Sequence, residues 1–155
     1  MNDAHLHLVV NHFPIIGTVF GLGILIFGLI LNNNATKNVA YVLFIASAIL
    51  AFLSIKTGGA AAHMVTEMPS LSIEKEVIHT HAKLASTFAI VCYLLGLVSL
   101  VGLYLNIKNN PKAKLVSFLV LTIAAICTFL GKEVATSGGE VRHTEIRTDE
   151  NKKNQ

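Results

Sequence analysis

Four long apolar runs divide this chain and decide what it can fold into. They extend from Leu8 to Leu31, from about Val39 to Ile55, from about Leu84 to Leu105 and from Leu115 to Leu130. Each reaches or approaches the roughly 17–25 residues that a helix needs to cross a bilayer. Charged residues make up 14% of the 155 residues, against about 25% in ordinary soluble domains. A chain this short has too little interior to hide so much apolar surface, so the sequence predicts a multi-pass membrane protein.

The connections between the runs predict the topology. Residues 32–38 and 106–114 are short polar turns that contain helix-stopping Asn and Pro, so the helices on either side of each turn should be antiparallel. We therefore expect an all-α, integral membrane, up-down four-helix bundle over residues 1–143. Residues 144–155 are polar and mixed in charge and predict a flexible tail. A cleaved signal peptide is the alternative for the first run, but that run lacks a basic start and a small-residue cleavage site and is too long.

All seven histidines fall at one end of such a bundle. In an antiparallel four-helix chain, the start of the first and third helices and the end of the second and fourth lie at the same face. The histidines occupy these four places: His5, His7, His12, His63, His79, His81 and His143. This clustering singles out one face as the functional one, although solvated interfacial histidines remain an alternative for some of them.

The histidine segments also repeat. T-G-G-A-A-A-H (residues 57–63) and S-G-G-E-V-R-H (residues 137–143) share a hydroxyl, two glycines and a histidine at an offset of 80 residues. H-L-H at residues 5–7 recurs as H-T-H at residues 79–81, at an offset of 74. Each half begins and ends on the same side, so the sequence predicts two duplicated helical hairpins related by an axis along the membrane normal.

These residue types point to haem or metal binding. Neutral imidazole is the commonest protein ligand for metal ions, and helix bundles place such ligands on facing helices. The chain has no C-x-x-C-H sequence, so a haem would be held without covalent attachment, as haem b. We expect one or two haem b groups. The glycine pairs, Gly58 with Gly59 and Gly138 with Gly139, would let a flat macrocycle or another backbone come close, unless they simply end or loosen a helix.

The repeat and the helical phase rank the candidate ligands. His63 and His143 are the firmest because each closes a copy of the glycine motif. His81 lies about 60° from a stripe of small residues on its helix, closer than His79 at about 100°, so His81 should point inward. His81 is therefore one expected partner of His63 and His143. The repeat and the shared face, together with the resemblance described next, make His12 the other. The small residues themselves, including the G-x-x-x-G of Gly17 and Gly21, favour close helix packing over cofactor contact.

One known family resembles this chain at these motifs. H-L-V-V-N-H-F-P-I (residues 7–15), T-G-G (57–59) and G-G-E-V-R-H (138–143) are similar to motifs of a bacterial four-helix membrane family called domain of unknown function 2231. The resemblance implies that His7 and His12 take the places of the family's first two histidines, His79 or His81 that of the third, and His143 that of the last. Leu8 stands where the family has a proline, and the closing motif is about one residue shorter. The family also occurs with c-type cytochrome domains, which fits haem chemistry.

We therefore expect a b-type cytochrome-like subunit that transfers electrons with a quinone or a periplasmic c-type cytochrome, alone or in a larger respiratory complex. The pattern favours an electron-transfer subunit over a stand-alone enzyme. Two alternatives remain open: a zinc or copper binding or transport protein that uses the same histidines, and a non-catalytic membrane anchor. The net charge of +3 is modest and does not indicate nucleic-acid binding.

Lysines predict the orientation. The two loops opposite the histidines carry Lys37, Lys108, Lys112 and Lys114 and no acid, which favours the cytoplasm for these loops. The histidine face and both termini would then be periplasmic, in a bacterial inner membrane. Eight of the twelve basic residues lie on the histidine side, so the opposite orientation stays open.

Overall fold

The computed structural model describes residues 3–67 and 75–143, and helices are the only regular elements in this part of the chain. The predicted tail, residues 144–155, lies outside the described residues. The helices are α1 (Asp3–Val10), α2 (Phe13–Ile30), α3 (Asn34–Thr66), α4 (Lys75–Ile107) and α5 (Ala113–Arg142). The all-helical prediction is confirmed for the described residues.

Four stretches are long and apolar enough to cross a membrane: Ala4–Ile30, which combines α1 and α2, Asn34–Met64, Lys75–Ile107 and Ala113–Val141. They contain 27, 31, 33 and 29 residues, so each exceeds the roughly 20 residues that a spanning helix needs. The four predicted apolar helices are therefore present.

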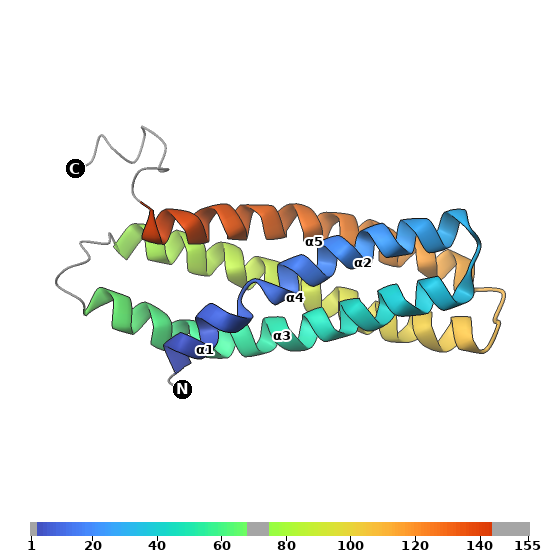
Figure 1. Cartoon of the computed structure of the whole chain (residues 1–155), viewed down its shortest axis with the longest axis horizontal. Coiled ribbons are helices and arrows are strands. Elements are labelled where there is room, and N and C mark those ends of the chain that lie inside the picture. The colour runs from blue at the N-terminus through green and yellow to red at the C-terminus, as the bar shows by residue number, and fades with distance from the viewer. Residues whose placement is uncertain (1–2, 68–74, 144–155) are drawn as a thin grey trace.

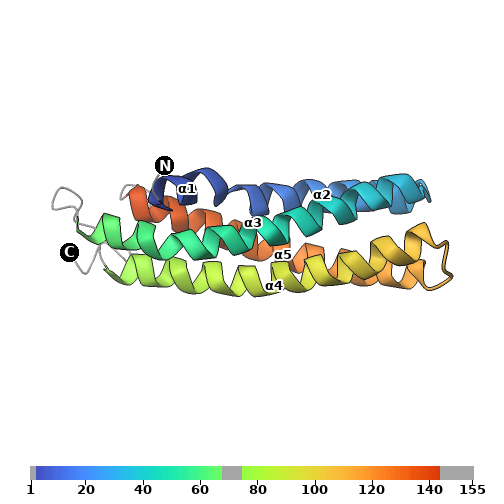
Figure 2. The ribbon, with the colours of Figure 1, turned by 90° about the horizontal axis from the view of Figure 1, so that it is seen from below.

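The long helices run side by side along an elongated bundle (Figure 1 and Figure 2). α3 packs against α2 and α4, and α5 packs against α4 and α2, so α2 and α4 occupy diagonal corners. α1 leaves this arrangement and packs on α3. The start of α4, the far ends of α3 and α5, and α1 all lie at the same end (Figure 1). We call this the histidine end, because it carries His5, His7, His63, His79, His81 and His143.

The first apolar run is broken between α1 and α2, at Asn11 and His12. Pro14 stands in the first turn of α2 and is buried. Proline has no N–H to donate to the carbonyl of Val10, four residues earlier, so a continuous helix would lose a backbone hydrogen bond there. The break lets α1 turn away from the axis of α2 and approach α3.

Three helices extend well beyond their apolar runs. α3 continues from Ile55 to Thr66, α4 begins at Lys75, and α5 reaches Arg142. His63, His79 and His81 therefore lie on helices and not in connections. The alternative that the glycine pair ends a helix is wrong for α3, since Gly58 and Gly59 lie inside it and seven more helical residues follow.

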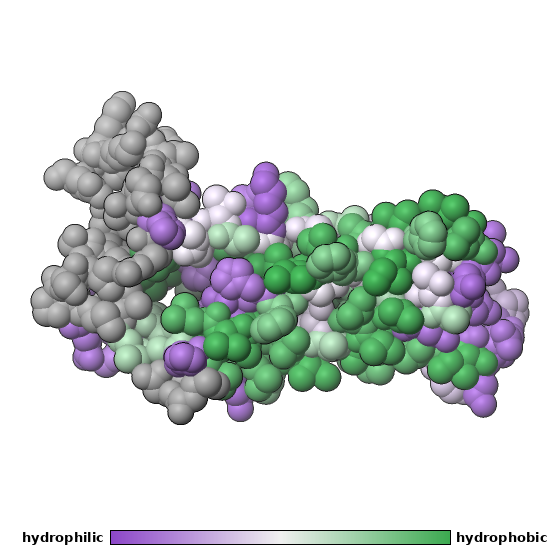
Figure 3. Space-filling view, viewed as in Figure 1, coloured by the Kyte–Doolittle hydropathy of each residue, from purple (hydrophilic) through white to green (hydrophobic). Residues whose placement is uncertain are grey.

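Large apolar side chains face outward from this bundle. Leu8, Ile90, Leu97 and Phe129 are 63–69% exposed. In Figure 3 hydrophobic surface covers much of the middle of the molecule, and hydrophilic side chains lie at the end opposite the histidine end. A soluble monomer rarely exposes such a continuous apolar surface. The surface is the one expected where hydrocarbon replaces water as the solvent.

Small residues bring the helices together. A Cβ atom on Gly21 would lie 2.5 Å from the ring of Phe44, and one on Gly96 would lie 2.6 Å from the Cβ of Ala48. A Cβ on Gly17 would collide with the Ser47 hydroxyl. The close packing predicted for Gly17 and Gly21 is what the structure has, and Gly96 packs in the same way.

Burial repeats at the two offsets of the sequence repeat. Shifted by 74 positions, every buried residue of α2 falls on a buried residue of α4: Pro14, Thr18, Gly21, Leu25 and Gly28 on Phe88, Cys92, Leu95, Ser99 and Gly102. Shifted by 80 positions, buried residues of α3 fall on buried residues of α5: Lys37, Ala40, Phe44, Ser47, Ala51 and Thr57 on Ser117, Val120, Ala124, Cys127, Gly131 and Ser137. The two hairpins thus bury equivalent positions, except that the fully buried Tyr41 corresponds to the half-buried Leu121.

Candidate histidine site

His7 on α1 is held by the histidine end of α3. Its Nδ1 lies 3.0 Å from the carbonyl oxygen of Ser54 and 3.4 Å from the hydroxyl oxygen of Thr57. A carbonyl oxygen only accepts hydrogen bonds, so Nδ1 of His7 carries the hydrogen and donates it. The lone pair of the neutral ring is then on Nε2.

His81 on α4 is held in the same way by α5. Its Nδ1 lies 2.9 Å from the hydroxyl oxygen of Ser137, and that hydroxyl donates to the carbonyl oxygen of Val134 at 3.1 Å. The hydroxyl has one hydrogen; when that hydrogen goes to Val134, the hydroxyl accepts from Nδ1 of His81. In that arrangement His81 has the same tautomer as His7, with the lone pair on Nε2.

A glycine lies against the edge of each imidazole ring. A Cβ atom on Gly58 would lie 3.3 Å from Cε1 of His7, and one on Gly138 would lie 3.1 Å from Cε1 of His81. Both distances are tighter than ordinary van der Waals contact, so a side chain here would push the ring away. The hydroxyl residue and the glycine that follows it together form a seat for one imidazole edge.

The two arrangements are equivalent under the repeat. His7 and His81 are 74 residues apart, and Thr57 and Gly58 are each 80 residues from Ser137 and Gly138. We call these groups the first histidine site (His7, Ser54, Thr57, Gly58) and the second histidine site (His81, Val134, Ser137, Gly138). They come from opposite halves of the chain and lie at the same end of the bundle.

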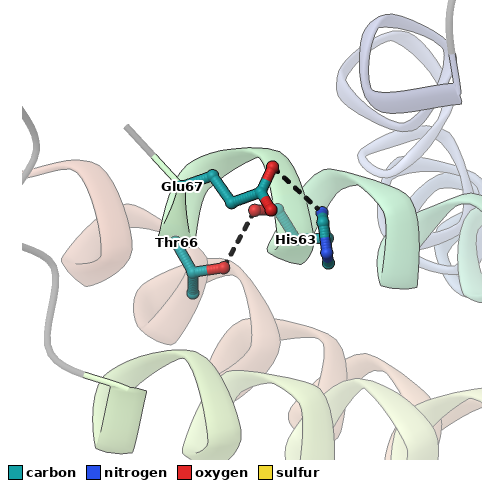
Figure 4. A network of polar contacts seen from close by, with 3 residues as sticks. All are labelled: His63, Thr66 and Glu67. Carbon is teal, nitrogen blue, oxygen red and sulfur yellow. Dashed lines mark hydrogen bonds and ion pairs between the residues drawn. The ribbon is translucent and has the colours of Figure 1, made fainter. Parts of the chain in front are cut away.

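His63 is not part of either group. Its side chain is 71% exposed, and Nδ1 lies 3.4 Å from a carboxylate oxygen of Glu67 one turn later on the same helix. Figure 4 shows this contact and the Thr66 hydroxyl that donates to the His63 carbonyl oxygen at 2.8 Å. An exposed pair four residues apart contributes little to stability, and nothing here directs His63 toward another predicted ligand.

The other predicted ligands are more exposed than His7 and His81. His12 is exposed, and its Nδ1 contacts the side-chain oxygen of the adjacent Asn11. His79 and His143 are exposed, and the backbone N–H of His143 caps α5 by donating to the carbonyl oxygen of Gly139. A Cβ on Gly59 would meet nothing within 4 Å, so Gly59 is not needed for a close approach. Within residues 3–67 and 75–143, no group of three or more His, Cys, Asp or Glu side chains is placed to hold a metal ion.

The sequence contains the repeat, but the expected ligands were its last residues, His63 and His143. The members that contact an imidazole are the first two, Thr57 with Gly58 and Ser137 with Gly138. Ser54 contributes through its backbone carbonyl, so its side-chain identity carried no signal. The shared hydroxyl at an offset of 80 was the available clue.

No family model, curated protein or solved structure matches this chain. The resemblance to domain of unknown function 2231 therefore stays an expectation drawn from the motifs alone.

Proposed function

We propose that this protein is an integral membrane haem b protein in which His7 and His81 would hold one haem through Nε2. The observation that carries the proposal is the pair of histidine sites. Metal-ligating histidines commonly donate the other ring N–H to a carbonyl or a hydroxyl, which sets the tautomer and the orientation of the ring. Both His7 and His81 have this arrangement.

The number and placement of the histidines suit haem better than a closed metal site. A porphyrin supplies four ligands to its iron and needs two more from the protein, whereas structural zinc usually takes four protein ligands. Two equivalent histidines from opposite halves of the chain would supply that number of ligands. This proposal replaces His12, His63 and His143 as ligands.

Among the largest fully buried side chains, Tyr41, Phe44 and Leu25 lie away from the histidine end. α3 at the histidine end is the glycine and alanine run of residues 58–62, and none of these residues is fully buried. A bulky planar group requires small side chains next to the residues that hold it.

When bound, the haem supplies reversible one-electron transfer, and the protein would hold it and tune it. Redox partners would be a quinone in the bilayer or a c-type cytochrome at the histidine end. We further propose that the two hairpins arose by duplication, because sequence motifs, burial and the two histidine sites all repeat at the same offsets. The protein would lie in a bacterial inner membrane with the histidine end on the periplasmic side.

The test is the visible absorption spectrum of detergent-purified protein, before and after dithionite. We expect a low-spin haem b spectrum that is lost or becomes high-spin in His7→Ala and in His81→Ala. His63→Ala and His79→Ala are matched controls, since both side chains are exposed at the same end, and they should keep the spectrum.

Two outcomes would overturn the proposal. A colourless protein with stoichiometric zinc or copper would select the metal-binding alternative, and a colourless protein without metal would select a membrane anchor. An unchanged low-spin spectrum in both His7→Ala and His81→Ala would reject these two ligands.

A further inference from the structure

An open apolar groove runs between α3 and α4, midway along the long helices. It has a volume of about 450 Å³. Its walls are Ile45, Ile49 and Phe52 of α3 and Tyr93, Leu97 and Leu100 of α4. Ile49, Leu97 and Leu100 are 50–63% exposed, so the groove opens on the outer surface of the bundle, where hydrocarbon would surround it.

Two small residues form the floor of the groove. Gly96 and Ala48 meet there, and a Cβ atom on Gly96 would lie 2.6 Å from the Cβ of Ala48. At the equivalent positions on α2 and α5, offsets of 74 and 80 place the larger residues Leu22 and Thr128. The groove is therefore a feature of the α3–α4 interface, and the repeat does not supply the same floor between α2 and α5.

The end of the bundle opposite the histidine end is positively charged. We call it the loop end, and it holds the turns at residues 31–33 and 108–112. Lys108, Lys112 and Lys114 are exposed there, and Lys37 lies near the start of α3. Residues 4–66 and 77–132 contain no Asp or Glu, so no acid at this end offsets the four lysines. Anionic lipid headgroups are attracted to such a lysine cluster at the end of membrane-spanning helices.

Lys108 lies in line with the groove. Its backbone N–H donates to the carbonyl oxygen of Tyr104 at 3.1 Å, so Lys108 continues the helical path of α4 beyond Ile107. It follows Leu97 by eleven residues, which gives a rise of about 16 Å and a rotation about 20° from whole turns. That rise matches half of the hydrocarbon thickness of ~30 Å, so a lipid with its phosphate at Lys108 has acyl chains that reach the groove.

The start of α3 is tied to the same end of α4. The Asn106 side chain, two residues before Lys108, donates to the carbonyl oxygen of Asn34 at 2.9 Å and to the side-chain oxygen of Asn38 at 2.6 Å. The N-terminal end of a helix carries partial positive charge, which adds to the charge of Lys108. The two helices that form the groove therefore also bring positive charge together at the loop end.

We propose that the groove binds one anionic phospholipid, with an acyl chain between α3 and α4 and the phosphate at Lys108. The inference rests on the proposed membrane insertion and not on haem, because the groove and the two histidine sites share no residue.

Charge at the loop end favours this occupant over two others. A quinone is neutral and gains nothing from the lysines. A second copy of this chain, related by a twofold axis along the membrane normal, would bring two loop ends of like charge together. An anionic phospholipid fits both the apolar groove and the lysines.

The test is native mass spectrometry of the full-length protein, purified in detergent and mixed with phosphatidylglycerol or phosphatidylcholine that carry the same oleoyl chains. We expect one phosphatidylglycerol to be retained, roughly fivefold more tightly than phosphatidylcholine, because a lysine near the headgroup contributes about this factor. Dihexanoyl phosphatidylglycerol has the same headgroup on short chains and should be retained only weakly.

Two variants separate the headgroup contact from the groove. Lys108→Gln should remove the preference for phosphatidylglycerol and leave the retention of phosphatidylcholine unchanged. Ile49→Trp fills the groove and should weaken the retention of both lipids. Lys83→Gln and Ile90→Trp are matched controls, since both side chains are exposed and lie outside the groove, and they should bind like the unaltered protein.

The proposal is overturned if the unaltered protein retains both oleoyl lipids equally, or if each variant and its control lose the same amount of binding. Equal retention of the dihexanoyl lipid would assign the binding to the phosphate alone and reject the groove. A two-copy species that Ile49→Trp abolishes would assign the groove to a second copy of the chain. Failure of membrane insertion itself is measured separately, by the accessibility of the two ends of the bundle from either side of the membrane.

Discussion

At the scale of single residues, an oxygen on the neighbouring helix determines which nitrogen of each imidazole carries the hydrogen. For His7 this oxygen is the carbonyl of Ser54, and for His81 it is the hydroxyl of Ser137. The first acceptor is part of the backbone and the second is a side chain. Mutation can therefore remove the acceptor in the second histidine site and cannot easily do so in the first.

Ser137→Ala should weaken haem binding by roughly 10–100-fold, the usual effect of removing a group that orients a ligating histidine. The His81 ring would lose its acceptor and rotate away from the orientation that exposes Nε2. Titration of the apoprotein with haem measures the effect. Ser137→Thr keeps the hydroxyl, as Thr57 does in the first histidine site, and should bind nearly as well as the unaltered protein. Equal affinities of the Ala and Thr variants would show that the hydrogen bond does not position His81.

Gly138→Ala tests the seat of the same ring. The added Cβ would lie 3.1 Å from Cε1 of His81 and push the ring off its rotamer, at a cost of roughly 0.5–1.5 kcal/mol. That cost corresponds to a loss of up to about tenfold in haem affinity. Gly59→Ala is the matched control because its Cβ would meet nothing within 4 Å. The low-spin fraction at limiting haem should fall in Gly138→Ala and not in Gly59→Ala. A larger fall in Gly59→Ala would contradict the contact between Gly138 and the His81 ring.

At the scale of elements, glycines set how closely the helices approach. Gly21 on α2 lies against the ring of Phe44 on α3, whereas Gly23, half a turn away, faces open space. The two positions belong to the same helix and differ only in what a side chain would meet. Substitutions at these two positions therefore distinguish the effect of interhelical packing from that of helix propensity.

Gly21→Ala should therefore destabilise the bundle by about 1–3 kcal/mol, as overpacking does. Gly23→Ala should be neutral or stabilising by up to about 1 kcal/mol, because alanine is the better helix former. Unfolding of detergent-solubilised protein in SDS, followed by circular dichroism, gives both values. If Gly23→Ala were the more harmful change, the α2–α3 contact would be assigned to the wrong face.

At the scale of the whole molecule, four antiparallel spans return the chain to its starting side. If the four helices span a membrane, the histidine end and the turn that contains Asn109 face opposite sides of it. Both native cysteines are buried, so a single introduced cysteine can report sidedness.

His79→Cys should be labelled by a membrane-impermeant maleimide in intact cells, and Asn109→Cys only after the membrane is opened. Both positions are exposed in the bundle, so access depends on the membrane alone. Labelling of both from one side would reject the four-span topology. If Asn109→Cys were labelled in intact cells and His79→Cys only after the membrane is opened, the predicted orientation would be wrong and the four-span topology would stand.

The sequence by itself determined the number of apolar helices, their antiparallel order and the gathering of histidines at one end, because these follow from length, hydropathy and the parity of the spans. It also contained the two repeat offsets that relate His7 to His81 and Thr57 to Ser137. Only the tertiary structure decided which histidines are held by a neighbouring helix. His63 closes a repeated motif, but its side chain on α3 is exposed. His7 reaches Ser54 because the helix is interrupted before Pro14, which lets α1 pack against α3. A repeat marks equivalent positions along the chain, whereas a hydrogen bond between helices depends on the helix bend and side-chain direction, which arise only when the helices pack.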